Sequence, residues 1–392
     1  MRQRRKLRRQ NTTKKIMKIR DILAVGLRYA TPEGGWSEEI MEEDCIHTLI
    51  AVRTDEGLTG FGSVYTNDAL VRGALSVLEP LYHGENALEP ERVSEKLRQH
   101  MFWLGRGGSI EHTISGIDIA LWDILGKATG QPVGRLLGGR YRERVMPYAS
   151  LLMDDPEPLT EHLLQVKAQG FRAFKMGWGP FGRKNAALDE AIVRAARDAI
   201  GPDNLLMVDA GGSDACWPNG YKWALRTSQM LADYDVAWFE EPLKPDAIED
   251  YALLRQMSPV PISGGEVLTR RQAFRPWLEA RALDIVQPDV TKVGGITESR
   301  RIAWMAQDHG VRFIPHGWNT AIGLAADLQL ASAFPDTDLV EYITGSPYLD
   351  ELSVGGWSLD ADGMLAIPDA PGLGVTLDMD AVAKYTQGEK WL

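Results

Sequence analysis

Cysteine is scarce in this chain, since Cys45 and Cys216 are the only two among 392 residues. Two cysteines do not make the disulfide framework of a small secreted domain, so a reduced, cytoplasmic setting is expected. Long apolar runs are also missing. No stretch holds the roughly 18 uninterrupted apolar residues that a membrane span needs, and no membrane partner is expected.

Positive charge is in deficit. The 43 Lys and Arg residues face 54 Asp and Glu residues, which gives a formal net charge of −11. This balance argues against nucleic acid as the main partner. The first residues, MRQRRKLRRQNTTKKI, are basic but lack the apolar segment of a secretory signal. We expect residues 1–16 to be a disordered leader or the product of an upstream start; a nucleic-acid or membrane-surface arm is the alternative.

The length predicts more than one domain, because a single β/α barrel needs about 250 residues. The surplus lies mainly before residue 140. There IHTLIAVRTDEGLTGFGSV alternates like an antiparallel hairpin with a turn near residues 55–57, and helical stretches follow from Asp68. The sequence therefore predicts an α+β domain over residues 17–140, a barrel over 141–350, and a C-terminal segment over 351–392.

Polar side chains close a series of short apolar runs in the second half of the chain. The runs recur about every 25 to 30 residues, the rhythm of a parallel β/α barrel, and functional side chains sit at the carboxyl ends of such strands. RVMPYASLL and FRAFKMG supply two earlier strands, so eight strands are expected. The polar residues are Asp209, Glu240, Glu266, Asp289, His316 and Glu341.

Asp209, Glu240 and Glu266 are carboxylates on three consecutive strand ends. Three anions in one pocket repel each other unless a cation neutralises them, so their spacing predicts a metal site. Oxygen ligands without Cys or His suit a hard divalent ion, with Mg²⁺ the first choice and Mn²⁺ the second. The alternative is that Lys or Arg side chains at the barrel rim pair with these carboxylates.

The next two strands end in Asp289 and His316. A carboxylate beside an imidazole fixes its tautomer and raises its basicity, which would leave His316 a base. Glu341 is expected to close the ring on the last strand, unless it is a satisfied core carboxylate. Lys175 in FKMG projects toward the same mouth, to pair with a substrate carboxylate or to balance Asp209. A metal beside one base suits removal of a proton α to a carboxylate.

Seven motifs in order resemble the enolase superfamily, specifically its mandelate racemase-like subgroup, from about Met17 to the C-terminus. They are SGIDIALWDILGKATGQPVGRLLGG, VDAGG, WFEEPL, SGGE, QPDVTKVGGIT, IPHGWNTAIGLA and IPDAPGLGV. The resemblance implies a modified (β/α)7β barrel under an N-terminal α+β capping domain that the C-terminal segment completes. It also implies one Mg²⁺ held by Asp209, Glu240 and Glu266, a His316–Asp289 base, and Glu341 as an acid or hydrogen-bonding residue.

Two departures from the resemblance bear on the reaction. Members that racemise usually carry Lys-x-Lys on the second strand, whereas this chain reads Lys175-Met176-Gly177, with glycine in place of the second base. One-sided chemistry favours β-elimination of water over racemisation. Many relatives also have Asn where this chain has Gly211, which we expect to open space beside the metal.

In such dehydratases the substrate is an aldonic or aldaric sugar acid and the product a 2-keto-3-deoxy acid. His316 would remove the C2 proton, Lys175 and Mg²⁺ would hold the carboxylate, and His316 or Glu341 would protonate the leaving hydroxyl. Relatives are often homo-oligomers, which is the expectation for this chain. The candidate substrate-binding residues are Trp36, Tyr65, Trp178 and Trp318, for which packing is the alternative.

Other reactions remain open at the level of sequence. A cycloisomerase or lactone isomerase acting on a sugar acid would use the same metal and a single base. A racemase or epimerase is a further alternative, although it needs a second base. A non-catalytic barrel that only binds a ligand is a candidate of another class, but the intact metal and base residues argue against it.

Overall fold

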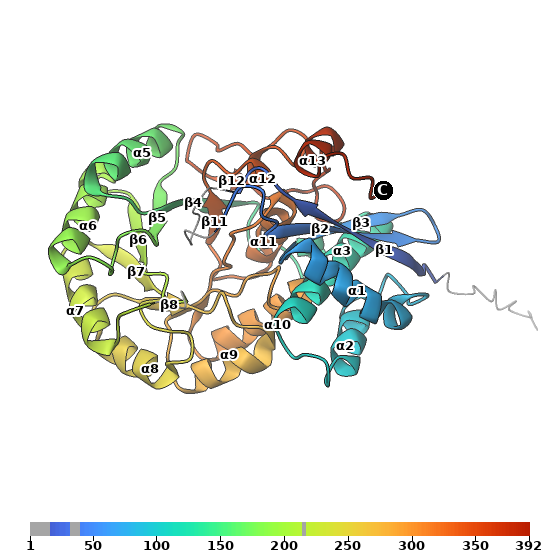
Figure 1. Ribbon diagram of the computed structural model, residues 1–392, viewed down its shortest axis with the longest axis horizontal. Coiled ribbons are helices and arrows are strands. Elements are labelled where there is room, and N and C mark those ends of the chain that lie inside the picture. Colours follow the sequence, from blue (N-terminus) through green and yellow to red (C-terminus); the bar gives the residue numbers. More distant parts are fainter. Residues whose placement is uncertain (1–15, 32–39, 214–216) are drawn as a thin grey trace, which may run out of the picture.

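The computed structural model describes residues 16–31, 40–213 and 217–392. A barrel and a capping domain lie side by side, with the cap built mainly from the N-terminal part of the chain (Figure 1). Residues 1–15 of the basic leader, and the segment 32–39, which contains Trp36, fall outside the described residues. Among the helices that are described, none combines the length and apolar character needed to cross a bilayer.

Eight parallel strands form the barrel sheet in the order β10-β9-β8-β7-β6-β5-β4-β11, as expected from the apolar runs. Between the two ends of this path, the Thr337 hydroxyl donates to the Phe313 carbonyl at 2.9 Å, and Arg312 pairs with Asp338 at 2.5 Å. The strands are β4 (Arg144–Leu152), β5 (Ala173–Gly177), β6 (Leu205–Asp209), β7 (Val236–Glu240), β8 (Ile262–Gly264), β9 (Ile285–Val286), β10 (Arg312–Phe313) and β11 (Leu339–Ile343).

Each barrel strand except the last is followed by a helix of ten residues or more on the outer face, which makes the barrel a (β/α)7β fold (Figure 1). The first helix after β11 is the four-residue α12 (Pro347–Asp350). The longer helices follow the first seven barrel strands in chain order. They are α5 (Pro156–Ala168), α6 (Ala186–Ile200), α7 (Tyr221–Ala232), α8 (Ile248–Met257), α9 (Arg270–Glu279), α10 (Gly295–Asp308) and α11 (Ala321–Ala333).

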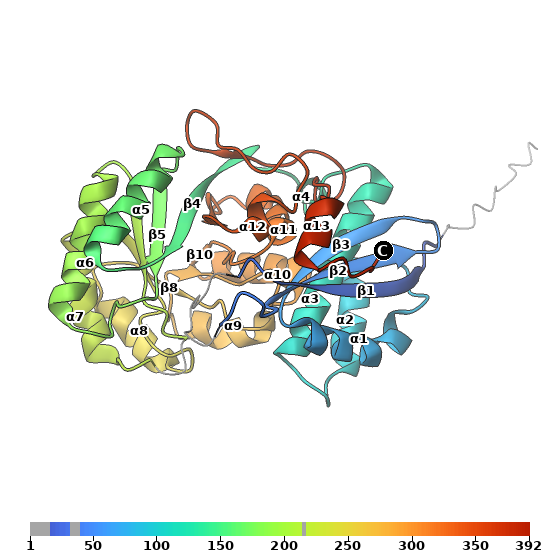
Figure 2. The ribbon, with the colours of Figure 1, turned by 45° about the horizontal axis from the view of Figure 1, so that its top comes forward.

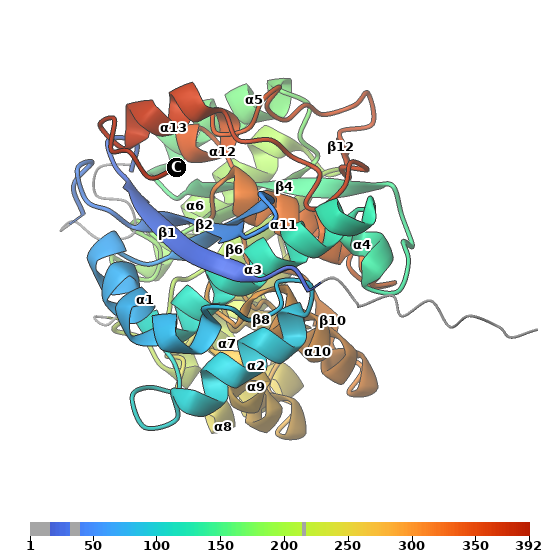
Figure 3. The same ribbon diagram turned by 90° about the vertical axis from the view of Figure 1, so that its right-hand side faces the viewer.

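The cap joins an antiparallel sheet of order β1-β2-β3 to a set of helices, and the predicted hairpin is its β2–β3 pair. Viewed from the cap side, β1 and helices α1 and α2 lie in front of the barrel (Figure 3). Strand β1 was not predicted, because its run IRDILAVGL ends in consecutive buried residues and does not alternate. The elements are β1 (Ile19–Leu27), β2 (His47–Thr54), β3 (Thr59–Tyr65), α1 (Asp68–Tyr82), α2 (Pro90–His100), α3 (Ser109–Thr129) and α4 (Val133–Leu136).

Helix α3 fastens the cap to the barrel at the start of α10. The Asp118 carboxylate accepts a hydrogen bond from the backbone N–H of Thr297 at 2.9 Å. The Trp122 indole donates to the Thr297 hydroxyl at 3.0 Å. Gly295 has φ 75°, and a Cβ atom there would collide with the Asp118 carboxylate. Two of the sequence motifs, SGIDIALWDILGKATG and VGGIT, are therefore the two sides of one contact.

The C-terminal segment returns to the cap, as expected. Helix α13 (Met379–Tyr385) lies beside the β1-β2-β3 sheet (Figure 2). The Tyr385 carbonyl accepts from the Arg28 backbone N–H at 2.9 Å. Arg72 on α1 pairs with Glu389 at 2.7 Å. Before this helix, β12 (Leu365–Ala366) pairs antiparallel with the start of β4, so the segment contacts both domains.

Candidate active site

Three carboxylates meet at the carboxyl ends of adjacent barrel strands. Asp209 and Glu240 are the last residues of β6 and β7, and Glu266 lies two residues beyond β8. One carboxylate oxygen from each lies within 4.8 Å of the other two. Burial, and then the charge of Glu240, raise the pKa of Asp209 well above its usual value. The trio thus lacks enough positive charge, and its oxygen-only donors fit a hard divalent cation such as Mg²⁺.

Lys175 on β5 lies between this trio and the last barrel strand. Its Nζ is 2.7 Å from Glu240 Oε1, 2.9 Å from Glu341 Oε1 and 3.5 Å from Asp209 Oδ2. Burial by itself would lower the pKa of Lys175, but Glu240 and Glu341 raise it well above its usual value. Lys175 is therefore a fixed cation, suited to holding an anionic group and unsuited to accepting a proton.

Glu240 is further positioned by two donors to its second oxygen. The Trp238 indole donates to Glu240 Oε2 at 2.9 Å, and the Gln287 side-chain amide donates to the same atom at 2.8 Å. Sequence reasoning missed Gln287. The sequence feature that could have identified it is the alternation of side chains along a strand. Gln287 lies two residues before Asp289 and should therefore point to the same face.

His316 and Asp289 form the expected pair. His316 Nδ1 lies 2.8 Å from Asp289 Oδ2, and Thr291 donates to the other carboxylate oxygen through its backbone N–H at 2.7 Å and its hydroxyl at 2.6 Å. Burial acts to raise the pKa of Asp289, but Lys292 and His316 lower it to about 2. An ionised Asp289 assigns the proton to Nδ1, so Nε2 is the reactive atom of the ring.

The Nε2 atom faces Glu266, whose Oε2 lies 2.9 Å away. Burial would lower the pKa of His316, but the Glu266 and Glu341 carboxylates raise it well above its usual value. A cation on Glu266 would oppose this effect and favour the basic, neutral ring. The carboxylate trio and His316 thus influence each other directly.

Lys292 is a second buried cation at the mouth, and sequence reasoning did not single it out. Its Nζ lies 3.6 Å from Asp289 Oδ2 and 3.9 Å from Glu266 Oε1. It also lies 4.1 Å from the centre of the Tyr65 ring, at the end of cap strand β3. The structure therefore brings Tyr65 to the site, where it packs on a lysine. The sequence feature that could have identified Lys292 is its position three residues after Asp289 in the motif QPDVTKVGG.

Glu341 completes the ring of polar groups from β11. Its Oε2 accepts from the Gly317 backbone N–H at 2.8 Å, and its Oε1 is the atom near Lys175. Burial acts to raise the pKa of Glu341, but Lys175 and His316 lower it below its usual value. Glu341 is ionised in this state and accepts hydrogen bonds.

The expectation that Gly211 opens space beside the metal is wrong, because Trp178 fills that space. A Cβ atom on Gly211 would lie 2.7 Å from Cδ2 of the Trp178 indole. Both residues have φ near 64°, in the left-handed region. Trp178 thus packs on the backbone next to Asp209, while Trp318 lines a neighbouring cavity.

The end of β5 leaves no room for a side chain at Gly177. Gly177 pairs in register with Asp209 across β5 and β6. A Cβ atom on Gly177 would lie 2.8 Å from the Asp209 Cβ and 3.2 Å from its Oδ2. A side chain at this position would displace Asp209, so the position offers no second base.

Comparison with known proteins agrees with this fold. Residues 25–138 match the model of the mandelate racemase / muconate lactonizing enzyme N-terminal domain, and residues 159–381 match the enolase C-terminal domain-like family. The chain belongs to the enolase superfamily, in its mandelate racemase-like group.

Individual relatives carry two kinds of name. The chain is 34% identical over 356 residues to a D-galactarolactone cycloisomerase from Agrobacterium fabrum, covering 86% of this chain and 91% of that protein. It is 32% identical to a D-xylonate dehydratase from Haloferax volcanii, covering 95% of each. The crystal structure of a 3,6-anhydro-D-galactonate cycloisomerase from Zobellia galactanivorans superposes with TM-score 0.83 at 32% identity, covering 94% of this chain and 99% of that one.

Proposed function

We propose that the protein is a Mg²⁺-dependent dehydratase of a sugar acid. It removes the proton at C2, next to the carboxylate, and eliminates the 3-hydroxyl as water to give a 2-keto-3-deoxy acid. The observation that carries the proposal is the asymmetry of the site. One base, His316 held by Asp289, faces the mouth, while the position of the second racemase base is Gly177, packed on Asp209. A single base suffices for elimination and does not suffice for racemisation.

The chain's own residues divide the work. Lys175 holds the substrate carboxylate. Asp209, Glu240 and Glu266 would hold the metal, which would stabilise the negative charge that develops on that carboxylate. His316 Nε2 takes the C2 proton, and the C2–H electron pair forms the C=C bond of the enolate. That pair then moves to form the C2=C3 bond as the C3–O bond breaks, and the imidazolium gives its proton to the leaving hydroxyl, which departs as water. The resulting enol takes a solvent proton at C3 and becomes the 2-keto-3-deoxy acid.

The charge state of Glu341 favours His316 as the acid. Since Lys175 keeps the pKa of Glu341 low, its carboxylate has no proton to give in this state. Glu341 instead fixes Lys175 and accepts a hydrogen bond from a substrate hydroxyl. The D-xylonate dehydratase among the similar proteins supports the elimination reaction.

Cycloisomerisation of a sugar acid or its lactone is the second candidate, because two of the similar proteins are named cycloisomerases. It would use the same metal and the same single base. The two reactions differ in mass balance, since elimination releases one water and isomerisation releases none.

A screen of the purified protein with Mg²⁺ against aldonic and aldaric acids, with semicarbazide to detect 2-keto-3-deoxy products, tests the proposal. We expect at least one acid to give the product, and no product with His316→Asn. Conversion of a lactone or anhydro acid without loss of water, and of no open-chain acid, would assign cycloisomerisation instead.

A further inference from the structure

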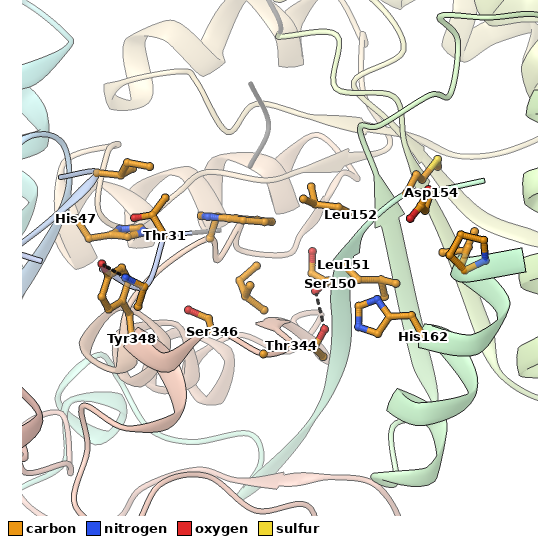
Figure 4. A pocket seen from close by; sticks show the side chains of 18 residues that line it. Thr31, His47, Ser150, Leu151, Leu152, Asp154, His162, Thr344, Ser346 and Tyr348 are labelled. Atoms are coloured by element: carbon orange, nitrogen blue, oxygen red, sulfur yellow. Dashed lines mark hydrogen bonds between the residues drawn. The ribbon is translucent and has the colours of Figure 1, made fainter. Parts of the chain in front are cut away.

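A cavity of about 430 Å³ lies between the cap and the barrel end. This volume is within the range of small-molecule sites. The cavity is bounded by the ends of β4 and β11, by α5, and by the cap residues at the start of β2. His47 and Tyr348 lie at one end, and Asp154 and His162 at the other (Figure 4).

The cavity adjoins the proposed active site. Its lining includes Trp318, two residues after His316, and Ile343, two residues after Glu341 on the same face of β11. It also includes Ser150, the register partner of Lys175. Neighbours of His316, Glu341 and Lys175 along the chain or across the sheet therefore line this cavity.

The lining offers hydroxyls and apolar surface but no fixed cation. None of the described residues that line the cavity is lysine or arginine, and Asp154 is its one carboxylate. Within the described chain, the Ser150 and Ser346 hydroxyls make no hydrogen bond, so they are available to a ligand.

The two buried lysines of the site cannot pair with a charged group at the far end of the substrate. Lys175 is held by Glu240 and Glu341, and Lys292 lies against Asp289, Glu266 and the Tyr65 ring. His47 does not supply a charge, because burial lowers its pKa to about 4, with a smaller contribution from Lys292. Its ring packs edge-on against Tyr348, with centroids 5.9 Å apart.

We propose that this cavity receives an uncharged far end of the substrate, so the enzyme acts on sugar monoacids, the aldonates, in preference to diacids, the aldarates. The inference rests on the proposed function. A second carboxylate would lose its hydration in the cavity without gaining a cation, and Asp154 would repel it. A terminal CH₂OH group instead finds the Ser150 and Ser346 hydroxyls and the apolar wall.

Matched acids that differ only in the terminal group test this preference. We expect kcat/KM for D-galactonate or D-gluconate to exceed that for D-galactarate or D-glucarate by about tenfold or more. Equal or higher efficiency on the diacid of both pairs would overturn the inference while leaving dehydration intact. Binding is measured separately by calorimetry on His316→Asn with Mg²⁺. Tighter binding of the diacids, or no binding of either class, would overturn it even without turnover.

Two variants locate the discrimination in the cavity. Ser346→Lys places a cation in the wall and should narrow the monoacid preference, whereas Ser346→Gln, of similar length but neutral, should not. Identical preferences for monoacids in these two variants would place the discrimination elsewhere and contradict the proposal.

His162→Gln removes the one exposed imidazole of the described lining and should leave the preference for monoacids unchanged. A diacid activity that disappears in His162→Gln would show that His162 anchors a second carboxylate, which would also contradict it.

Discussion

Gly177 and Asp209 are register partners on β5 and β6, and a Cβ atom on Gly177 would lie only 2.8 Å from the Asp209 Cβ. The absence of a side chain at residue 177 is thus a packing requirement of the proposed metal site. It also removes the base that a two-sided reaction would need. One structural relationship therefore links the proposed metal ligand Asp209 to the one-base character of the proposed reaction.

Gly177→Lys should not create a racemase. The new side chain would displace Asp209, so we expect metal affinity and dehydration to fall together, by about 100-fold or more. Metal affinity is measured by titration calorimetry with Mn²⁺, and racemisation by the appearance of the C2 epimer. A variant that keeps its metal and epimerises the substrate would show that the structure around Asp209 can accommodate a side chain at residue 177.

Glu240→Gln should weaken metal binding by about 100-fold or more, because the site loses one ligand charge. The new amide would also meet two donors, from Trp238 and Gln287, that now serve Glu240 Oε2. Calorimetry with Mg²⁺ or Mn²⁺ measures the change, and Glu79→Gln on the exposed face of α1 is the control. Unchanged affinity would remove Glu240 from the metal site.

Gly211→Ala should destabilise the protein for two reasons. Residue 211 has a left-handed backbone conformation, and the added Cβ atom would meet the Trp178 indole. Gly84 provides the matched control, because it has φ 76° and nothing within 4 Å of a Cβ atom. Gly84→Ala should cost about 1 kcal/mol for the left-handed backbone alone. Gly211→Ala should cost more, because its Cβ meets the Trp178 indole, and part of that excess should vanish in Trp178→Ala/Gly211→Ala. Denaturant unfolding measures these values, and equal costs for the two alanine variants would refute the contact.

Asp118 should make stability depend on pH. Burial raises the pKa of Asp118 to about 6, from an ordinary value of 3.8, against smaller opposing effects of Arg98 and Thr297. The folded state therefore binds this proton more tightly than the unfolded state, and the associated stability, present below about pH 4, is lost as pH rises to 6. Two pKa units correspond to about 3 kcal/mol.

Asp118→Asn isolates this effect. The difference in free energy of unfolding between the variant and the wild type should change by about 3 kcal/mol in favour of the variant from pH 4 to pH 7. Asp308→Asn at the exposed end of α10 is the control. Parallel pH profiles for Asp118→Asn and the wild type would show that Asp118 does not titrate in this range.

The sequence predicted the parts of the site that follow strand ends. Asp209 and Glu240 each close an apolar run, and the carboxyl ends of parallel strands lie at the same end of the barrel. The regular spacing of these runs was therefore enough to predict that the two side chains lie close together. Gln287 and Lys292 were missed, because each lies inside a motif whose other residues already had an explanation. Their contacts depend on strand parity and on the turn after Asp289.

The contact between Trp178 and Gly211 was beyond the sequence for a different reason. It joins two loops from neighbouring strands and depends on positive φ at both residues, which a motif does not encode. The cavity is likewise built from the cap, two barrel strands and α5. That its described lining residues include no lysine or arginine becomes visible only when these segments are assembled.

The mass and isotope content of the product test the central claim of one-base elimination most directly. The active sugar acid is incubated with the enzyme and Mg²⁺ in D₂O, and substrate and product are analysed by NMR and mass spectrometry. We predict a 2-keto-3-deoxy acid that has lost one water and gained one solvent deuterium at C3, with no C2 epimer of the substrate, and no reaction with His316→Asn. A C2 epimer carrying deuterium, or a product with the full mass of the substrate apart from exchanged hydrogen, would contradict the account.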